Sequence, residues 1–543
     1  MLKTTRRKLI LGSLASLVAA GVNISAAKAE KNNSTRPQSS KDPKLPSSLR
    51  VKAVVIGSGF GGAVAAYHLG RHKIDTLVLE RGRRWDVKPG KPGPFATSKQ
   101  TDGRALWLSE TDLLVTDGPK DPLNRYPGLV ERYNEDGIIV WASSGVGGGS
   151  LVYNTVLLQP SKENFAKVFP ASVNYDEMNR EYYPRVTEML DAGPIPDDIL
   201  SSPSYLGARV FLDYAARAGL PTQRINTATN WHTVRKELQG KLEASATAGE
   251  IWYGGNSGYK NSLDKNYLLK AQQSGHVQIS PLSNVTEIRE VGKGYQISVD
   301  RLDESGAVVS RHSISCDYLF MGAGSMGSTS LLVKAKHKGT LPKLSDDIGK
   351  YWGNNGDTFG SFRTGSPAGS QSGGPAHIVG LDYQDNPYGP QTVIAFPQAN
   401  NTEDSLIFLG MALPEETGYW EYSDQLNRAI LHWPSLNSSD AIQRLEKRME
   451  YTLTRLANQV SPASARQAAV DSIKVSVGAT AHPCGGAVMD RACDTYGRVK
   501  GYKGLYVVDG ALVPRGTAAA NPALTIGALA ERCMDNIIKN DII

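Results

Sequence analysis

The chain has 543 residues, which is too long for one ordinary domain and long enough to bury at least two hydrophobic cores. Its composition, with 40% hydrophobic and 21% charged residues, is that of a soluble globular protein. The formal net charge of +7 falls by five to +2 once the basic N-terminal 29 residues are set aside, and a net charge this small does not favour nucleic-acid binding.

Residues 1–29 are predicted to be a signal peptide. Arg6 and Arg7 lie in a basic start, an apolar run of about fourteen residues begins at Leu9, and small residues close the segment at Ala29. The paired arginines indicate export by the twin-arginine route, to the periplasm or the exterior. An uncleaved anchor is the alternative, although the apolar run is short for a membrane span. Residues 30–49 are polar and are predicted to form a flexible lead-in.

Residues 51–82 have the pattern of a dinucleotide-binding unit. A continuous apolar run predicts a strand buried on both faces, and a small-residue helix and a second strand follow it. Between them lies a glycine-rich turn, Gly57, Ser58, Gly59, Phe60, Gly61 and Gly62. Gly57 permits the tight turn, Gly59 lets the backbone approach a pyrophosphate, and Gly62 lets the helix pack on the strand.

Glu80 ends the second strand and is placed to accept hydrogen bonds from ribose hydroxyls. The N–H groups at the start of the helix would bind the phosphates. This pattern predicts a bound dinucleotide, but it does not distinguish a nicotinamide from a flavin.

A second glycine-rich segment, "GVGGGSLVYN", follows the apolar stretch "IIVWA". Consecutive glycines let backbone N–H groups reach a phosphate or a ring edge without obstruction by side chains. A flexible surface loop is the alternative. The residues concerned are Gly145, Gly147, Gly148, Gly149 and Ser150.

The four cysteines do not form a disulfide framework in a chain of this length. Cys484 and Cys493 could pair after export or could equally be free core thiols. The spacing of the cysteines fits no common zinc pattern, so we predict no metal site.

Near the C-terminus, a predicted strand from Leu505 to Val508 ends in Asp509 and Gly510. Asn521 and Pro522 then form a helix start, with Asn521 as the N-cap. A carboxylate on polyol hydroxyls and a positive helix end facing an electron-rich ring would suit a ribityl chain and a flavin. A capped helix that merely packs on a sheet would explain the helix alone.

Five segments resemble, in chain order, the bacterial cholesterol oxidases of the glucose-methanol-choline flavoenzyme family. They are "VVIGSGFGGAVAAYHL", "GVGGGSLVYN", "YLFMGAGSMGSTSLL", "AHPCGG" and "YVVDGALVPRGTAAANPALTIGALAER". The segment "KGTLPKLSDDIGKYWGNNGD" is similar too. The resemblance implies an α/β fold: a Rossmann-type doubly wound domain with non-covalent FAD, and an inserted α+β substrate domain on a mostly antiparallel sheet.

The resemblance also implies a discontinuous domain order. The FAD-binding domain is expected in residues 50–90, 255–350 and 472–543, with its glycine loop in 141–160. The substrate domain is expected in residues 161–254 and 351–471. Residues 91–140 would cover the FAD and form the cavity entrance.

By position, the resemblance assigns the first glycine turn and Glu80 to the ADP part of FAD and the second glycine segment to the flavin. The backbone of Val285 would meet the adenine, and Asn154 would line the cavity. Asp509, Gly510, Asn521 and Pro522 would lie at the flavin.

His482 lies in the tight turn "HPCGG", where Pro483 stiffens the backbone and Gly485 and Gly486 would let the chain pass close to the flavin. A neutral imidazole suits the removal of a hydroxyl proton near pH 7. From the residues alone, a structural histidine is the alternative. The resemblance implies that His482 positions and deprotonates the substrate hydroxyl, and that Asn521 polarises the site.

The resemblance implies oxidation of a 3β-hydroxysteroid to the 3-ketosteroid, with O2 reduced to H2O2 and with 5-ene to 4-ene isomerisation. A carboxylate performs that isomerisation in the family, and Glu403 is the nearest candidate, with a solvated loop acid as the alternative. Two other functions remain open: a dehydrogenase of another lipophilic alcohol with a non-oxygen acceptor, and a flavin-binding protein without turnover.

The expected partners are a sterol and O2, with no nucleic acid and with a monomer favoured. Because sterols lie in membranes, residues 105–115 are expected to touch a bilayer surface transiently. An ordinary core element explains these apolar residues equally well.

Overall fold

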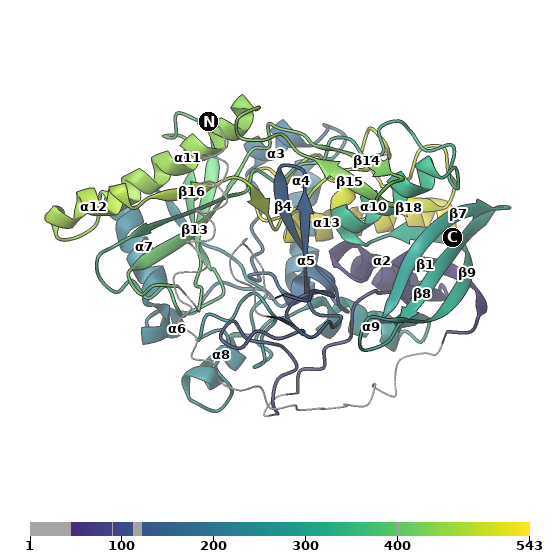
Figure 1. Ribbon diagram of the computed structural model, residues 1–543, viewed down its shortest axis with the longest axis horizontal. Coiled ribbons are helices and arrows are strands. Elements are labelled where there is room, and N and C mark those ends of the chain that lie inside the picture. The colour runs from purple at the N-terminus through teal and green to yellow at the C-terminus, as the bar shows by residue number, and fades with distance from the viewer. Residues whose placement is uncertain (1–44, 89–90, 112–121, 400) are drawn as a thin grey trace.

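The computed structural model describes residues 45–88, 91–111, 122–399 and 401–543 (Figure 1). The predicted signal peptide and residues 30–44 of the lead-in lie outside the described residues, as do residues 112–115 of the apolar segment 105–115. Within the described ranges, no helix is long and apolar enough to cross a membrane.

The larger sheet has a parallel core. β1 (Ser48–Ile56), β2 (Thr76–Leu79), β6 (Val277–Ser280), β9 (Val308–Met321) and β18 (Leu505–Val507) lie in the order β6, β2, β1, β9, with β18 beside the end of β9. β2 and the second half of β1 are fully buried, as their apolar runs predict. β7 (Ser283–Val291) and β8 (Gly294–Leu302) extend this sheet in antiparallel fashion.

Helix α2 (Phe60–Arg71) begins at the first glycine turn and packs against α9 (Tyr267–Gln273) and α13 (Pro522–Ile537). Gly61 lets the start of α2 pack closely on the backbone that follows β18, because a Cβ there would lie 2.0 Å from the carbonyl oxygen of Val508. α10 (Gly324–His337) lies against β7 and the hairpin of β14 (Tyr419–Ser423) and β15 (Arg428–His432).

The second sheet is antiparallel throughout. Its strands lie in the order β16 (Lys474–Ser476), β10 (Thr358–Arg363), β13 (Ser405–Ala412), β12 (Gln391–Ala395), β11 (Ile378–Asp382) and β5 (Thr222–Arg224). The long amphipathic helix α11 (Asp440–Ala457) covers β10, and α7 (Leu206–Arg217) and α12 (Arg466–Asp471) lie on the same part of the molecule (Figure 1). The two sheets confirm the predicted fold class.

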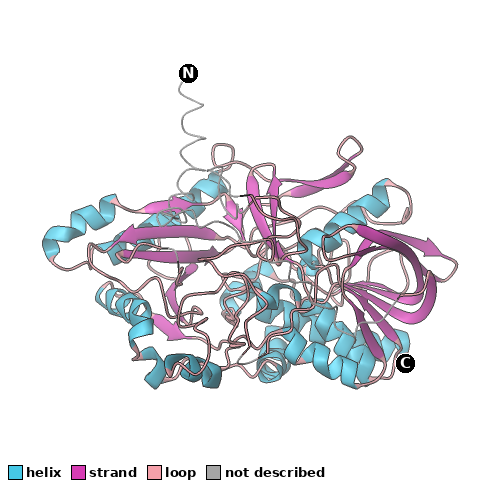
Figure 2. Ribbon diagram, turned by 60° about the horizontal axis from the view of Figure 1, so that its bottom comes forward, coloured by secondary structure: helices cyan, strands magenta, loops and turns pink. Residues whose placement is uncertain are grey.

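A small third sheet joins β3 (Val130–Glu135) and β4 (Ile138–Ser143) to β17 (Ala479–Thr480), which runs parallel to β4. Figure 2 shows the two large sheets at opposite ends of the molecule, with loops and short elements between them. The remaining α-helices are short and are α3 (Lys162–Val168), α4 (Tyr175–Glu177), α5 (Tyr183–Met189), α6 (Asp197–Leu200) and α8 (Trp231–Leu238).

All four cysteines are buried and unpaired. Cys484 and Cys493 are therefore core thiols rather than a disulfide, which settles the alternative that their positions leave open. Burial raises the pKa of both thiols, so they stay neutral.

Candidate active site

One cavity of about 790 Å³ runs between the two large sheets and collects most of the predicted site residues. Its volume lies within the usual range for small-molecule sites. The predicted residues that line it are Gly57, Ser58, Gly59, Phe60, Gly61, Glu80, Gly148, Gly149, Asn154, Val285, His482, Asp509, Gly510, Asn521 and Pro522. Gly62, Gly145, Gly147, Ser150 and Glu403 lie outside its lining.

The first glycine turn presents backbone to this cavity. Gly57 has a φ of 89°, which favours glycine, and a Cβ on Gly62 would lie 2.1 Å from the carbonyl oxygen of Gly57. At Gly59 the nearest atom to an added Cβ is 3.9 Å away, so a side chain there would project into the cavity. Gly149 is similarly open. The cradle therefore fits a ligand that approaches the backbone closely, as a dinucleotide pyrophosphate does.

Glu80 joins the two glycine segments. Its carboxylate accepts hydrogen bonds from Ser58 N (3.0 Å), Ser58 Oγ (2.7 Å), Gly82 N (2.8 Å) and Gly145 N (3.1 Å). Gly145 therefore contributes by fixing Glu80 rather than by lining the cavity. A ribose hydroxyl that donates to Glu80 would bind a carboxylate that already accepts hydrogen bonds from both glycine segments.

Ser150 stabilises the second glycine segment through two hydrogen bonds of its hydroxyl. Its hydroxyl donates to the carbonyl of Gly147 at 2.7 Å and accepts from Leu263 N at 3.0 Å. Gly148 packs against the first glycine turn, since a Cβ on it would lie 2.6 Å from the Cα of Gly59. The two segments predicted to bind one cofactor are therefore in direct contact.

Three long helices begin at the cavity, and their N-termini differ. In the part of the chain that the structure describes, no side chain caps α2 or α13 through a hydrogen bond. At α10, the backbone N–H of Gly324 donates to Asp509 Oδ2 at 2.8 Å. The first two helix ends are therefore available to an anionic or electron-rich ligand, and the third is occupied by a carboxylate.

Asp509 is held by the protein more tightly than its predicted polyol contact implies. Besides Gly324, its carboxylate accepts from Ser328 Oγ at 2.5 Å and Ala511 N at 2.9 Å. Burial raises the pKa of Asp509 to about 6, against the opposing effect of these hydrogen bonds. Asp509 thus ties the end of β18 to α10 while it lines the cavity.

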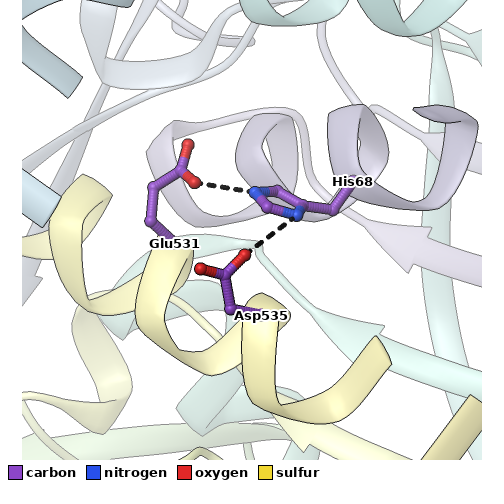
Figure 3. A group of neighbouring side chains, drawn as sticks. All are labelled: His68, Glu531 and Asp535. Carbon is purple, nitrogen blue, oxygen red and sulfur yellow. Dashed lines mark hydrogen bonds and ion pairs between the residues drawn. The ribbon is translucent and has the colours of Figure 1, made fainter. Parts of the chain in front are cut away.

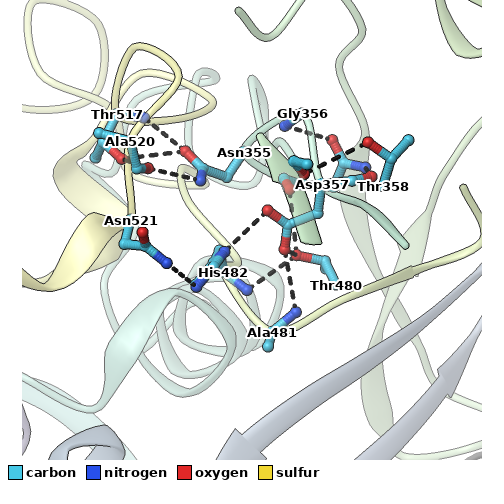
Figure 4. A network of polar contacts seen from close by, with 12 residues as sticks. Asn355, Gly356, Asp357, Thr358, Thr480, Ala481, His482, Thr517, Ala520 and Asn521 are labelled. Carbon is cyan, nitrogen blue, oxygen red and sulfur yellow. Dashed lines mark hydrogen bonds and ion pairs between the residues drawn. The ribbon is translucent and has the colours of Figure 1, made fainter. Parts of the chain in front are cut away.

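His482 follows β17 and lies between an acid and an amide (Figure 4). Its Nδ1 is 2.9 Å from Oδ1 of the fully buried Asp357, and Asn521 Nδ2 is 3.4 Å from its Nε2. The other oxygen of Asp357 accepts from Thr480 Oγ1 at 2.7 Å and from Ala481 N at 3.3 Å. The imidazole is therefore fixed on one side and presents its other nitrogen beside Asn521.

Asp357 is a residue that sequence reasoning missed. It ends the segment "WGNNGD" and lies 125 positions before His482, so no local pattern links the two. Paired backbone hydrogen bonds between Gly353 and Cys484, of 2.8 and 3.0 Å, bring their segments together. The resemblance of this segment to the flavoenzymes was the available signal, but it gave Asp357 no function.

Gly485 and Gly486, which are predicted to let the chain pass close to the flavin, lie outside the cavity lining. A Cβ on Gly485 would lie 2.3 Å from the carbonyl oxygen of Tyr351, and one on Gly486 would lie 2.1 Å from Thr329 Oγ1. Both have positive φ values, 87° and 103°. These glycines let the turn pack against its own protein neighbours, and Pro483 is the member of the turn that lines the cavity.

Asn521 is at the N-cap position of α13, but its side chain does not cap the helix as predicted. The amide instead points to His482, and Asn521 Oδ1 is buried without a hydrogen-bond partner among the described residues. The hydroxyl of Tyr153, which lines the same cavity, has no partner there either. Asn521 Oδ1 and Tyr153 Oη are therefore available to hydrogen-bond the polar edge of a bound cofactor or substrate.

Beyond His482, aromatic and aliphatic side chains line the cavity. Trp141 lies 5.7 Å from Phe359 and 6.2 Å from Trp252, and Trp252 lies 6.2 Å from Phe396, all between ring centroids. Leu409 completes this wall, which we call the aromatic wall. Its members come from β4, β10, β13 and two loops, so no periodic sequence pattern could have identified them.

The prediction that Glu403 is a carboxylate of the site is wrong. Glu403 is exposed in the turn before β13, where its carbonyl accepts from Ala368 N at 2.7 Å. The carboxylates that do line the cavity in the described residues are Glu80, Glu131, Glu135 and Asp509. Glu131 binds Arg81 and Tyr133, and Glu135 binds Arg428, so these acids are already paired.

A second cluster of histidine and carboxylates joins α2 to α13 (Figure 3), and its residues lie outside the cavity lining. His68, Glu531 and Asp535 place their ligand atoms within 4.8 Å of one another, as a metal site would. However, Arg185 binds Glu531 at 3.0 Å and Asp535 at 2.8 Å. The guanidinium supplies the positive charge that these acids need, so the cluster is an ion-pair network.

Comparisons with known proteins find similar families and relatives. A family model described as GMC oxidoreductase matches residues 421–530, and one described as NAD(P)-binding Rossmann-like domain matches residues 55–85. A cholesterol oxidase of Acinetobacter baumannii is 23% identical over 89% of this chain and 94% of the relative. A cholesterol oxidase of Mycobacterium tuberculosis is 26% identical over 88% of this chain and 89% of the relative.

Solved structures share the fold across nearly the whole chain. Pyridoxine 4-oxidase from Mesorbium loti superposes with a TM-score of 0.62 at 15% identity, over 90% of this chain and 99% of that one. A formate oxidase from Aspergillus oryzae, in a study of FAD modification, superposes with a TM-score of 0.58 at 13% identity, over 90% and 98%. At identities this low, the similarity shows the fold alone. The substrate has to be inferred from the residues of the cavity.

Proposed function

The chain belongs to the GMC oxidoreductase family and binds FAD, and from this premise we propose that it oxidises the 3β-hydroxyl of a cholesterol-like steroid. The overall reaction converts the steroid alcohol and O2 into the 3-ketosteroid and H2O2. The observation that carries the proposal is the continuity of one cavity, from the glycine turns past His482 and Asn521 to the aromatic wall.

The aromatic wall supports a lipophilic substrate. Trp141, Trp252, Phe359 and Phe396 offer large rigid faces, and burial of apolar surface contributes roughly 25 cal/mol per Å² to binding such a molecule. A small polar alcohol would leave this surface in contact with water. Two relatives are named cholesterol oxidase, and cholesterol is a molecule of the kind that the aromatic wall would suit.

His482 and Asn521 would handle the hydroxyl. With Asp357 ionised, Nδ1 of His482 donates to it and Nε2 keeps a lone pair, which accepts the hydroxyl proton. Asn521 orients the oxygen beside this lone pair. When bound, FAD supplies the two-electron acceptor for the hydride that leaves the carbinol carbon.

Isomerisation of the double bond is not part of the proposal. Moving the double bond requires a carboxylate beside the ring, and Glu403 lies outside the cavity. The acids that line the cavity in the described residues already bind other protein groups. We therefore expect the 3-keto-5-ene steroid as the product.

The FAD is proposed to be non-covalent. In the described part of the chain, no cysteine lines the cavity, and its histidine is engaged by Asp357 and Asn521. Acid precipitation of the purified protein should leave the yellow colour in solution. Colour in the pellet would mean a covalent link.

Export by the twin-arginine route and a monomeric state also remain proposals, supported by the sequence alone. Cell fractionation with a variant in which Lys replaces Arg6 and Arg7 tests the route. The transient contact of residues 105–115 with a bilayer surface is tested by flotation with cholesterol-containing vesicles.

The visible spectrum of the purified holoprotein tests the function itself. Anaerobic cholesterol should abolish the absorption of oxidised flavin, while cholesteryl methyl ether, which lacks the free hydroxyl, should not. Admission of air should restore the spectrum and release H2O2. A flavin that cholesterol reduces but air does not reoxidise would identify the dehydrogenase alternative, and a flavin unaffected by cholesterol would refute the steroid substrate.

A further inference from the structure

We propose that Asp357 is the positioning residue for His482: its carboxylate fixes the Nδ1–H tautomer, so that Nε2 keeps the lone pair at the cavity. This inference rests on the proposed function, because it concerns the base that removes the hydroxyl proton. It adds a residue to the site that neither the sequence nor the comparisons assign.

The contacts of Asp357 define one geometry for the pair. Both carboxylate oxygens are used, Oδ1 by His482 Nδ1 and Oδ2 by Thr480 Oγ1 and Ala481 N (Figure 4). Thr480 Oγ1 also accepts from His482 N at 2.9 Å, so the same hydroxyl fixes the acid and the backbone of the base. The carboxylate cannot rotate away without breaking all three contacts.

The placement of Asp357 explains why this acid can act only through His482. It is fully buried at the start of β10, and it lies outside the cavity lining, whereas His482 lies in it. A bound substrate would meet Nε2 and never the carboxylate. An ionised carboxylate accepts hydrogen bonds only, so the Nδ1 that faces it must carry the proton.

The other titratable groups around His482 leave Asp357 as its charged partner. From the start of α13 the histidine faces the neutral amide of Asn521, and its own turn contributes the Cys484 thiol, which burial keeps neutral. Asp509, from the end of β18, is occupied by Gly324 and Ser328. Tyr153 lines the cavity with a phenol whose pKa burial raises further.

The tautomer can be measured without any substrate. In holoprotein labelled with ¹⁵N-histidine, we expect His482 to show the Nδ1–H form at neutral pH, assigned by the signal that His482→Gln removes. Asp357→Asn should abolish that preference. A wild-type His482 in the Nε2–H form, or an unchanged tautomer in Asp357→Asn, would overturn the proposal even if cholesterol proved not to be the substrate.

Turnover gives the second test. Asp357→Asn keeps the shape but removes the charge, and we expect kcat to fall about 100-fold with KM within about threefold, the signature of a group that acts in the transition state. Asp357→Glu, which restores the charge, should recover part of kcat.

Asp382→Asn is the matched control. Asp382 is also buried, is bonded by Arg455 and Thr452 and ends β11 of the second sheet, and it lies outside the cavity lining. It should keep the wild-type kcat and the Nδ1–H tautomer of His482. If Asp357→Asn keeps the wild-type kcat, Asp357 is a structural acid and the proposal is wrong. An inactive wild type with the expected tautomer would instead reject the proposed substrate.

Discussion

Two histidines of this chain contact buried carboxylates, and only one of the two faces a cavity. His68 Nε2 lies 2.7 Å from Glu531 Oε2 and its Nδ1 lies 3.7 Å from Asp535 Oδ1, so acids face both ring nitrogens. His482 meets Asp357 through Nδ1 and leaves Nε2 beside Asn521 at the cavity. Both histidines contact a buried acid. They differ in the second ring nitrogen: that of His482 is at the cavity, where a ligand can reach it, and that of His68 is not. This difference separates a candidate base from a structural histidine.

The surroundings of the acids differ in the same sense. Glu531 also accepts hydrogen bonds from Tyr267 Oη at 2.6 Å and from Arg185. Its charge therefore stabilises contacts between helices. Asp357 is bonded by Thr480 and Ala481, which are neutral, so its charge acts on the histidine alone. We therefore expect the His68 cluster to govern stability and the His482 cluster to govern turnover.

The largest expected effect follows the removal of His482. His482→Ala should lower kcat by about 10²- to 10⁴-fold, the usual contribution of a general base, because the acids that line the cavity in the described residues bind other protein groups. The variant should stay yellow, since the glycine turns that would bind the cofactor are untouched. Stopped-flow reduction of the flavin by cholesterol measures the loss.

His68→Gln is the control for this experiment, since it removes an imidazole that contacts a buried carboxylate in the other cluster. It should keep the wild-type rate of flavin reduction. If flavin reduction were slow in His68→Gln and fast in His482→Ala, the roles assigned to the two clusters would be reversed.

The next effect is on stability. Glu531→Gln keeps the size of the side chain but removes the charge that faces His68 and Arg185, and breaking a buried pair in this way costs about 3 kcal/mol. Denaturant unfolding of the holoprotein should show this loss. The kcat of the folded variant should match the wild type, and a loss of kcat without a loss of stability would contradict the division between the clusters.

The pattern of success from sequence reflects how far apart the interacting residues lie. The turn from Gly57 to Gly62 and the helix start at Asn521 are local, so their spacing alone predicts a dinucleotide fold and a helix end at the cavity. Asp357 meets His482 only because Gly353 pairs with Cys484, a contact that no local pattern encodes. The aromatic wall likewise assembles from separate strands and loops.

Two predictions failed because proximity in sequence was taken for proximity in space. Glu403 is the nearest candidate carboxylate in the sequence, but the turn before β13 directs it to solvent. Asn521 occupies an N-cap position, yet the cavity offers its amide a partner in His482, and that contact replaces the cap. In both cases the tertiary environment, absent from the sequence pattern, decides what the side chain touches.

The response to pH should separate the clusters further. Burial raises the pKa of Glu531, but hydrogen bonds from His68, Tyr267 and Arg185 outweigh it, so the net pKa is below the ordinary value. A lowered folded-state pKa adds stability above the unfolded value of about 4.3, and this stability is lost as the pH falls through the folded value.

Glu531→Gln lacks this contribution, so its unfolding free energy should fall less steeply than that of the wild type below about pH 4.3, by at most about 1.4 kcal/mol per pH unit. Denaturant titrations across this range measure the slopes. Equal slopes in the two proteins would show that Glu531 does not ionise as a member of the network, whereas His482→Ala should keep the wild-type slope.

The smallest expected effect belongs to Glu403, the carboxylate that belongs to neither cluster. It is exposed and outside the cavity, and surface substitutions of this kind usually change stability by less than about 0.5 kcal/mol. Glu403→Gln should therefore keep the kcat, the unfolding free energy and the steroid product of the wild type. Chromatography of the product measures the position of the double bond, which we expect at 5,6 in both proteins. A 4-ene product from the wild type that becomes a 5-ene product in Glu403→Gln would mean that the turn before β13 folds into the cavity when substrate binds.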